Sequence, residues 1–287
     1  MADTAPFSLL LPVYRGDDAR FLRRAFTSSV HDQTLRPDEV IVVRDGPVPD
    51  EVEAVLRDLE TESPVPTTVL RLPDNIGLAH ALRKGLAACT HEIVARMDAD
   101  DISLPERFER QLAAMTADGL DMVGAGMFEF LEDNGKVLGR RTPPSGLERI
   151  RSYSRFHDPF NHPTVVYRKQ AVHKAGGYQE LGLMEDYWLF VRMIHSGAIV
   201  DNVPAPLLMY RVGAGAYRRR GGYKQLVAEL RLQREFRRIH FTTRRQMLRN
   251  IGIRASYRLV PVGIRQVIYR AFIANPGARK TRSARVE

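Results

Sequence analysis

The stretch Ile93-Val94-Ala95-Arg96-Met97-Asp98-Ala99-Asp100-Asp101 decides how the rest of the chain is interpreted. It joins an apolar run, typical of a buried strand, to a cluster of acids. In an extended chain, side chains two positions apart point to the same side, so Asp98 and Asp100 are expected to lie together. Neighbouring carboxylates repel each other unless a cation or fixed donors compensate. Mg²⁺ and Mn²⁺ prefer oxygen ligands and bring phosphate oxygens with them, whereas a solvated turn is the simpler alternative.

Apolar runs and helical patterns alternate through the first third of the chain. The predicted strands are residues 7–14, 40–43, 67–70 and 92–97. The predicted helices between them are residues 17–30, 50–60 and 76–89. Continuous apolar strands are typical of parallel sheets whose two faces are covered by helices. The alternation therefore predicts an α/β fold with a doubly wound, largely parallel sheet and a ligand at the carboxyl ends of its strands.

Polar residues follow these strands at their carboxyl ends. They are Tyr14, Asp45, the loop Pro73-Asp74-Asn75-Ile76-Gly77, and the pair Asp98 and Asp100. If the strands are parallel neighbours, these residues line one crevice. The sequence has neither G-x-G-x-x-G after its first strand nor G-x-x-x-x-G-K-[ST], so phosphate would be held by a metal or by scattered basic side chains. The acid pair is therefore more consistent with a metal site than with a chance turn.

The second half departs from strict alternation of strands and helices. Ser103 and Glu106 fit a capping box that opens a helix over residues 107–115. Predicted strands at 121–130 and 136–140 flank an Asn-Gly pair, a strong hairpin signal, and a short strand follows at 164–167. The loop before that strand contains His157 and His162. A loop histidine is more often a hydrogen-bonding group than a ligand, and a functional role is favoured for His162 alone.

The segment Leu183 to Ile194 predicts a buried helix that begins with two acids, Glu185 and Asp186, and contains the only Trp. Acids in a first turn stabilise any helix through its dipole, which is one interpretation. The other is a rigidly held catalytic carboxylate. Beside a metal-diphosphate site, such a carboxylate would take the proton from an attacking hydroxyl while the metal neutralises the leaving diphosphate. Glycosyl transfer with inversion at the anomeric carbon fits that division of roles.

Charge is unevenly distributed along the chain. The net charge is +9, yet residues 211–287 hold 20 Lys and Arg against three acids, while the remainder holds 31 acids against 23 basic residues. An amphipathic helix is predicted over 223–241, and a second Arg-rich apolar pattern covers 264–272. The Arg-rich pattern at 264–272 suits the surface of an anionic membrane, which we favour over packing on the catalytic domain.

The amino terminus lacks the pattern of a signal peptide, and no apolar run is long enough to span a bilayer. The lone Cys89 lies in a helical pattern, so neither a disulfide nor a thiolate metal site is expected. These features predict a cytoplasmic protein, peripheral on the inner face of the cell membrane.

Five motifs in order resemble the inverting family 2 glycosyltransferases with the GT-A fold. They are Leu11-Pro12-Val13-Tyr14, Val40-Ile41-Val42-Val43-Arg44-Asp45-Gly46, Asn75-Ile76-Gly77-Leu78, Arg96-Met97-Asp98-Ala99-Asp100-Asp101 and Glu185-Asp186. The resemblance covers roughly residues 7–225. Asn161-His162-Pro163-Thr164 and Tyr217-Arg218-Arg219-Arg220-Gly221-Gly222 look like the amylovoran-biosynthesis type found in exopolysaccharide and capsule synthesis. No Gln-x-x-Arg-Trp occurs, which favours a single addition over polymerisation.

The resemblance implies roles for individual residues. Asp186 would be the catalytic base, Glu185 would face the acceptor, and Asp98 and Asp100 would hold Mn²⁺ or Mg²⁺. The expected donor-binding residues are Pro12, Tyr14, Asp45, Asn75, Gly77, Arg96, Asp98 and Arg211. His162 and the run Arg218, Arg219 and Arg220 would lie in the acceptor region or in a loop that closes over the diphosphate. The basic run is equally consistent with a solvated loop.

The implied organisation is a single Rossmann-like catalytic domain with a mixed sheet over residues 1–222. Its donor half would be 1–102 and its acceptor half 103–222. A basic amphipathic helical extension at 223–276 and a disordered tail at 277–287 would follow. The expected partners are a nucleotide-diphosphate sugar, preferably a UDP-sugar, a lipid-linked saccharide acceptor and an anionic membrane surface.

Two alternatives remain at this stage. A sugar nucleotidylyltransferase shares the layout and the metal chemistry, but the expected Gly-rich, Arg-containing loop after the first strand is absent. Nucleic-acid binding by the basic tail is the non-enzymatic alternative, and it leaves the acidic motifs unexplained. No nucleic acid is expected as a partner.

Overall fold

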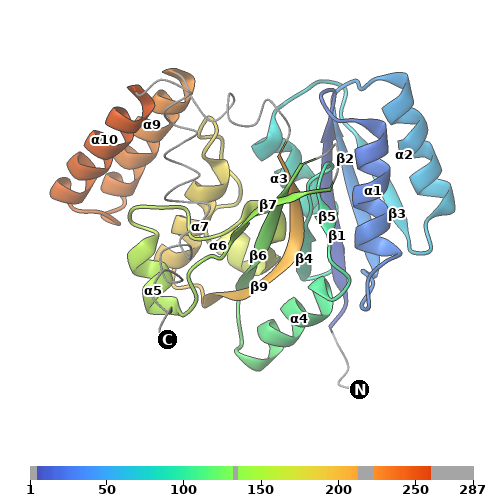
Figure 1. Cartoon of the computed structure of the whole chain (residues 1–287), viewed down its shortest axis with the longest axis horizontal. Coiled ribbons are helices and arrows are strands. Elements are labelled where there is room, and N and C mark those ends of the chain that lie inside the picture. The colour runs from blue at the N-terminus through green and yellow to red at the C-terminus, as the bar shows by residue number, and fades with distance from the viewer. Residues whose placement is uncertain (1–4, 132–134, 213–222, 260–287) are drawn as a thin grey trace, which may run out of the picture.

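The computed structural model describes residues 5–131, 135–212 and 223–259 (Figure 1). The first half alternates as predicted. Its elements are β1 (Phe7–Tyr14), α1 (Ala19–Val30), β2 (Glu39–Asp45), α2 (Asp50–Glu62), β3 (Thr67–Arg71), α3 (Leu78–Ala88) and β4 (Ile93–Arg96). Asp18 caps α1 by accepting hydrogen bonds from the amides of Arg20 and Phe21. The remaining elements are β5 (Ile102–Ser103), α4 (Arg107–Ala117), β6 (Met122–Phe130), β7 (Val137–Arg141), α5 (Leu147–Tyr153), the 3₁₀ helix η1 (His162–Thr164), β8 (Val166–Arg168), α6 (Lys169–Lys174), α7 (Glu185–His195), β9 (Val200–Arg211), α9 (Tyr223–Arg238) and α10 (Arg244–Leu259).

The strands form one mixed sheet in the order β3-β2-β1-β4-β8-β6-β9-β5, with β7 paired to β6. Strands β3, β2, β1 and β4 are parallel, so their carboxyl ends meet at one edge. Strand β8 is antiparallel to both β4 and β6 and joins the parallel half to the rest. The mixed sheet and the predicted β6–β7 hairpin are confirmed.

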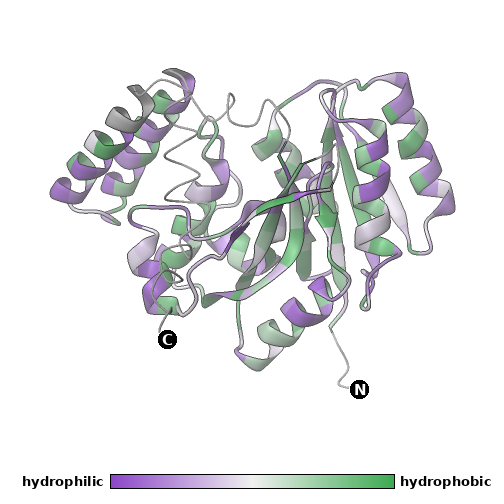
Figure 2. Cartoon of the chain, in the orientation of Figure 1, coloured by the Kyte–Doolittle hydropathy of each residue, from purple (hydrophilic) through white to green (hydrophobic). Residues whose placement is uncertain are grey.

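Helices cover both faces of the sheet, and the alternation of side chains along β1 shows how. Phe7, Leu9, Leu11 and Val13 pack with α1, α2 and α4 in one apolar cluster. Leu10, from the opposite side of the same strand, packs with α3, α6 and α7 in another cluster. Figure 2 shows the resulting pattern, with apolar strands at the centre and polar outer helix surfaces.

The capping box predicted at Ser103 is wrong. Ser103 belongs to β5, where it pairs with Leu208 of β9, and α4 begins at Arg107. The Ser103 hydroxyl lies 3.0 Å from that of Ser29 and accepts a hydrogen bond from Arg107. The Ser103 hydroxyl, which the local pattern had assigned to a helix cap, is therefore engaged in tertiary hydrogen bonds. The strand predicted from Thr164 likewise starts at Val166, because η1 precedes it.

The first helix of the basic extension packs on the catalytic domain. Ala228, Leu232 and Phe236 of α9 form an apolar cluster with residues of α7, including Tyr187 and Trp188. Helix α10 lies beside α9, and in Figure 1 the two form a hairpin at the opposite end from α1 and α2. The apolar face of α9 is therefore covered by the catalytic domain. The second predicted pattern, at 264–272, and the predicted tail lie outside the described residues.

Candidate active site

A cavity of about 670 Å³ lies at the carboxyl ends of the parallel strands. Most of the residues predicted to bind the donor or the metal line it. They are Pro12, Tyr14, Asp45, Asn75, Gly77, Asp98, Asp100 and Arg211. Glu185, predicted to face the acceptor, lines the cavity as well. Arg96, His162 and Asp186 do not line this cavity, and Arg218, Arg219 and Arg220 fall outside the described residues. The topology explains the grouping, because parallel neighbours place their carboxyl ends at one edge.

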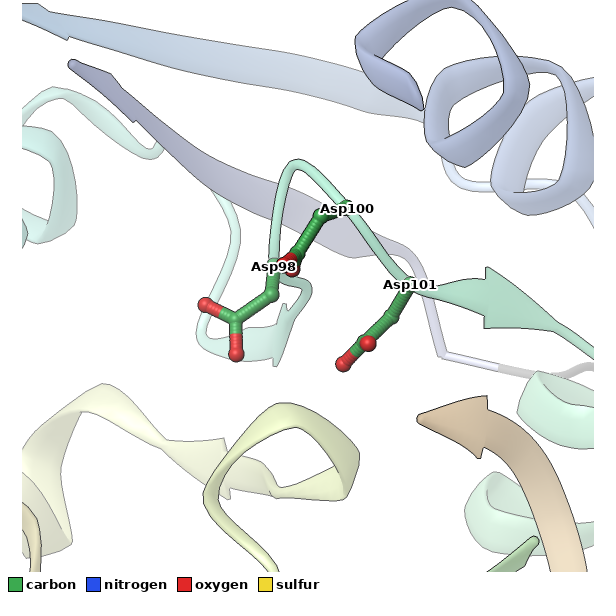
Figure 3. A group of neighbouring side chains, drawn as sticks. All are labelled: Asp98, Asp100 and Asp101. Atoms are coloured by element: carbon green, nitrogen blue, oxygen red, sulfur yellow. The ribbon is translucent and has the colours of Figure 1, made fainter. Parts of the chain in front are cut away.

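Three aspartates follow β4 in one tight loop. Carboxylate oxygens of Asp98, Asp100 and Asp101 all lie within 4.8 Å of one another (Figure 3). Burial and the neighbouring charge of Asp98 raise the pKa of Asp100 to about 6. No ion pair within 4.0 Å reaches Asp100 from the part of the chain that the structure describes. Oxygen ligands from Asp98 and Asp100, both in the cavity wall, are therefore suited to a hard divalent cation.

Asp101 differs from the other two acids. Its side chain is fully buried, and one carboxylate oxygen accepts a hydrogen bond from the amide of Arg211 at 2.9 Å. Burial raises its pKa well above the usual range. Asp101 therefore anchors the carboxyl end of β9 to the acidic loop.

Arg96 forms an ion pair with Asp98 from inside the protein. Its guanidinium is buried and does not line the cavity. Arg96 is therefore not placed for the direct contact with the nucleotide that the resemblance implied. Within the described part of the chain, Nε and Nη1 of Arg96 have no hydrogen-bond partner. Arg96 therefore acts on the cavity through Asp98, whose carboxylate it fixes and partly neutralises.

A second buried arginine, Arg107 of α4, holds the acidic loop in place. Its guanidinium donates to the carbonyl oxygens of Arg96 and Pro163 and to the Ser103 hydroxyl. Burial lowers its pKa to about 9. Sequence analysis missed this role, since an Arg in the first turn of an amphipathic helix gives no sign that its side chain turns inward.

The carboxylate of Asp45 organises the loop that follows β3. Its oxygens accept hydrogen bonds from the amides of Ile76 at 2.7 Å and Gly77 at 3.0 Å, and from the Asn75 side chain at 3.0 Å. Gly46 has a φ of +82° and a Cβ there would lie 2.5 Å from the Asn75 amide nitrogen, so only glycine permits this approach. Asp45 thus shapes the cavity wall as well as lining it.

Arg211, the last residue of β9, reaches the acidic loop from the opposite side. Its Nε donates to the carbonyl oxygen of Asp100 at 2.7 Å. The guanidinium lies 3.9 Å from the ring centre of Phe21 and 4.8 Å from that of Phe130. In contact with two rings at the cavity wall, it offers a fixed positive charge beside the acids.

Asp17 is a cavity residue that sequence analysis assigned only to the start of a helix. Its carboxylate accepts a hydrogen bond from the Tyr14 amide at 2.9 Å and lines the cavity with Asp98 and Asp100. Burial, and then the charges of Asp100 and Asp98, raise its pKa to about 7. Only the fold brings Asp17 to the other acids, more than eighty positions away along the chain.

We expect Asp17→Asn to stabilise the metal-free protein. The folded state keeps the Asp17 proton up to about pH 7, whereas the unfolded chain loses it near the ordinary value of 3.8. The free energy of unfolding therefore falls as pH rises from about 4 to 7. An Asn side chain does not titrate, so the variant avoids this loss, and its amide oxygen still accepts the hydrogen bond from the Tyr14 amide. Thermal melts in EDTA should show a gain of a few degrees at pH 8 and none at pH 4. An equal gain at both values would contradict the prediction.

Glu185 and Asp186 occupy the first turn of α7, as predicted. Burial raises the pKa of Glu185 to about 7, and it also raises that of Asp186. The Oδ1 of Asp186 accepts a hydrogen bond from the Tyr187 amide at 2.7 Å. Glu185 lines the cavity, while Asp186 lies next to His162 with a quarter of its side chain exposed. The buried body of α7 fixes both carboxylates.

Helix α10 supports the loop that faces α7. Asn250 donates to the carbonyl oxygen of Arg155 at 2.8 Å, and Arg254 donates to that of Phe156 at 2.6 Å. The same loop carries Asp158, whose pKa is raised by burial and then by the charge of Asp186. The basic extension is thus bound to the segment that leads to His162, a role that composition did not indicate.

Comparisons with known proteins agree with this geometry. Residues 8–177 match the family described as Glycosyl transferase family 2. The chain is 37% identical to the amylovoran biosynthesis glycosyltransferase AmsE of Erwinia amylovora, over 92% of this chain and 97% of the relative. It is 34% identical to the Escherichia coli UDP-Gal:alpha-D-GlcNAc-diphosphoundecaprenol beta-1,3-galactosyltransferase, over 94% of this chain and 98% of the relative.

Two solved structures share the fold. One is S. aureus TarS 1-349 in complex with UDP-GlcNAc, at a TM-score of 0.62 and 17% identity, covering 80% of this chain and 66% of that one. The other is a mannosyltransferase of Pyrobaculum calidifontis in complex with GDP-Man and Mn²⁺, at a TM-score of 0.63 and 15% identity, covering 94% and 76%. The α/β fold with its mixed sheet is that of the GT-A glycosyltransferases, as predicted.

Proposed function

Because the chain belongs to glycosyl transferase family 2, we propose that it transfers one hexose from a UDP-sugar to a hydroxyl of a lipid-linked saccharide, with inversion, in exopolysaccharide, capsule or cell-wall glycan synthesis. The observation that carries this proposal is the shared cavity. One space of about 670 Å³ joins the ends of β1 and β2 to Asp98, Asp100 and Glu185. The nucleoside of the donor would lie at the ends of β1 and β2, the diphosphate at Asp98 and Asp100, and the sugar next to Glu185.

On the donor side, Asp98 and Asp100 would hold Mn²⁺ or Mg²⁺, which supplies positive charge for the leaving diphosphate. The two carboxylates fit such a cation because they offer oxygen ligands in one cavity wall, with Asp98 already oriented by Arg96. The Mn²⁺ in the related mannosyltransferase structure supports this assignment. Arg211 would add a fixed charge beside the diphosphate, and the loop held by Asp45 would contact the nucleoside.

On the acceptor side, Asp186 would take the proton of the attacking hydroxyl. The carboxylate is held rigidly by α7 and partly exposed, and burial keeps its pKa above the ordinary range, which strengthens it as a base. Attack by that hydroxyl and departure of the diphosphate occur in one displacement, so the new bond has the opposite configuration from the old one. Transfer to a diphosphoundecaprenol-linked sugar by the E. coli relative supports a lipid-linked acceptor.

A screen of nucleotide sugars tests the donor assignment. Thermal melts would be recorded with UDP-, GDP-, ADP- and dTDP-hexoses, each with Mn²⁺ and with EDTA. Ligands that bind the folded state raise its apparent stability, so one UDP-hexose should give the largest shift, and only with the metal. A larger shift with another nucleoside would overturn the UDP assignment, and equal shifts in EDTA would overturn the metal requirement.

Two exposed apolar side chains of α10 support contact with an anionic membrane. Leu248 and Ile253 are exposed by 64% and 57%, and Arg244, Arg245 and Arg249 lie on the same helix. Apolar side chains flanked by arginines suit the headgroup layer of anionic lipids. Among the described helices, none has the length and hydropathy needed to cross a bilayer.

We expect the double change Leu248→Gln and Ile253→Gln to weaken sedimentation with vesicles containing phosphatidylglycerol, because it removes apolar area from the bilayer contact. The bound fraction should fall at least threefold, while transfer to a short soluble acceptor stays unchanged. Ile199→Gln, an exposed apolar residue before β9, is the matched control. An unchanged bound fraction in the double variant would contradict docking through α10.

A further inference from the structure

His162 lies at the junction between the candidate base and a chain of tyrosines. Its Nδ1 is 3.7 Å from the Oδ2 of Asp186, and its Nε2 is 3.1 Å from the Tyr178 hydroxyl. That hydroxyl lies 3.5 Å from the hydroxyl of Tyr167. His162 is buried, packs edge to face on Phe190, and is not among the residues that line the cavity. A direct contact with a sugar is therefore a poor explanation of its position.

The protonation of the ring restricts what His162 can do. Burial and the nearby Arg96 hold its pKa well below the ordinary value, so the imidazole is neutral and carries one N–H. Its Nε2 faces a tyrosine hydroxyl, which can donate a hydrogen bond to it. Its Nδ1 faces a carboxylate, which can only accept when ionised. The Tyr178 hydroxyl has one proton, and its contact with Nε2 at 3.1 Å is shorter than its contact with the Tyr167 hydroxyl at 3.5 Å. Donation of that proton to Nε2 places the ring proton on Nδ1, which satisfies both partners of the imidazole.

We propose that His162 is a positioning residue that fixes the carboxylate of Asp186 through Nδ1–H, with Tyr178 holding the ring in the required tautomer. The proposal rests on the assignment of Asp186 as the base. The Tyr187 amide donates to Oδ1 of Asp186, and Nδ1 of His162 lies 3.7 Å from Oδ2, so a small approach of the imidazole would restrain the second oxygen as well. A base that is already oriented takes the proton of the acceptor hydroxyl without a further rearrangement.

The neighbours of His162 in the sequence explain how the ring is held. The Asn161 side chain donates to the carbonyl oxygen of Ala125 at 2.8 Å. The carbonyl oxygen of Pro163 accepts from Arg107 at 2.9 Å, and the Thr164 hydroxyl donates to the carbonyl oxygen of Asn161 at 2.8 Å. These bonds fix the backbone on both sides of His162 and, with it, the position of the imidazole. This accounts for a motif that donor and metal binding leave unused.

Other charged groups act on the same carboxylate and set its background pKa. They are Arg96, Glu185, Asp158 and Asp98. All four remain in a variant of His162 or Tyr178, so a change in the pH profile of such a variant reports the imidazole contact itself.

The test compares His162→Phe, His162→Asn and Tyr178→Phe. Steady-state rates would be measured from pH 5 to 9 with the UDP-hexose selected by the donor screen, Mn²⁺ and a synthetic diphospholipid-linked GlcNAc acceptor. His162→Phe should lower kcat by about 100-fold and leave the donor KM within threefold, since a misplaced base costs on this scale. His162→Asn should recover part of the rate, because its amide can donate near the position of Nδ1.

The acid limb of the kcat profile separates positioning from a merely structural role. A hydrogen bond donated to the carboxylate lowers its pKa, so loss of that bond should move the acid limb to higher pH in His162→Phe, with a smaller move in Tyr178→Phe. Tyr178→Phe keeps the ring in place, which keeps the test valid if His162→Phe does not fold. Rates within threefold of the wild type and an unmoved acid limb would overturn the proposal. Asp186→Asn is measured alongside: if it retains transfer, the base assignment itself has failed.

Discussion

Asp186→Asn should abolish sugar transfer and leave donor binding intact. The amide is the same shape as the carboxylate but cannot accept the proton of the acceptor hydroxyl, so kcat should fall by about 1,000-fold. The variant should still bind the UDP-hexose with Mn²⁺, since Asp186 does not line the donor cavity. Rates would be followed by release of UDP and binding by calorimetry.

The matched control for Asp186→Asn is Glu148→Gln, which removes a carboxylate from an exposed position on α5. It should behave as the wild type in both measurements. Turnover by Asp186→Asn within tenfold of the wild type would show that another group takes the proton. Glu185→Gln would then be the next variant to measure, because Glu185 is the neighbouring acid in the same helical turn.

Asp100→Ala should remove the effect of the metal on donor binding. Asp100 lines the cavity and has no ion-pair partner within the described segments, so its carboxylate is free to bind a cation. Its loss should weaken donor binding in Mn²⁺ by about 100-fold, to the level that the wild type shows in EDTA, which corresponds to ~2.7 kcal/mol. Calorimetric titration of the UDP-hexose with Mn²⁺ and with EDTA measures both values.

Asp118→Ala, an exposed acid at the end of α4, provides the control for Asp100→Ala. It should retain the full difference between Mn²⁺ and EDTA. If Asp100→Ala also retained that difference, Asp98 or Asp101 would have to hold the metal. Asp101 could offer Oδ2, which has no hydrogen-bond partner in the described part of the chain, while Oδ1 keeps its bond to the Arg211 amide.

The first half of the fold could be predicted because its signals are local. Apolar runs marked the strands, Asp18 marked the start of α1, and the polar residues after each strand indicated the cavity. Family membership, inferred from five motifs, is confirmed over residues 8–177. Membership of this family takes the place of the alternative assignment as a sugar nucleotidylyltransferase.

The remainder depended on tertiary contacts that no local pattern encodes. Ser103 fits a helix cap by sequence, but in the fold its hydroxyl contacts Ser29 and Arg107. Asp17 joins the acids of the site only because β1 and β4 are neighbours in the sheet. Arg96 appeared to face the nucleotide, whereas its side chain turns inward to Asp98.

In the basic extension, too, the sequence pattern predicted a helix without indicating its tertiary contacts. The apolar positions of α9 predicted a helix but not what covers them, and the structure places that face on α7. Helix α10, in contrast, leaves Leu248 and Ile253 exposed while Asn250 and Arg254 hold the loop before His162. Both helices of the hairpin therefore contact the catalytic domain, α9 through its apolar face and α10 through Asn250 and Arg254.

The anomeric configuration of the product tests the central claim most directly, because a single displacement with Asp186 as base allows only one outcome. The transfer product formed from an α-linked UDP-hexose would be isolated and its anomeric proton coupling measured by NMR. We predict a β-linked product with the wild type and no product with Asp186→Asn. An α-linked product would contradict the single displacement and the role of Asp186 as its base.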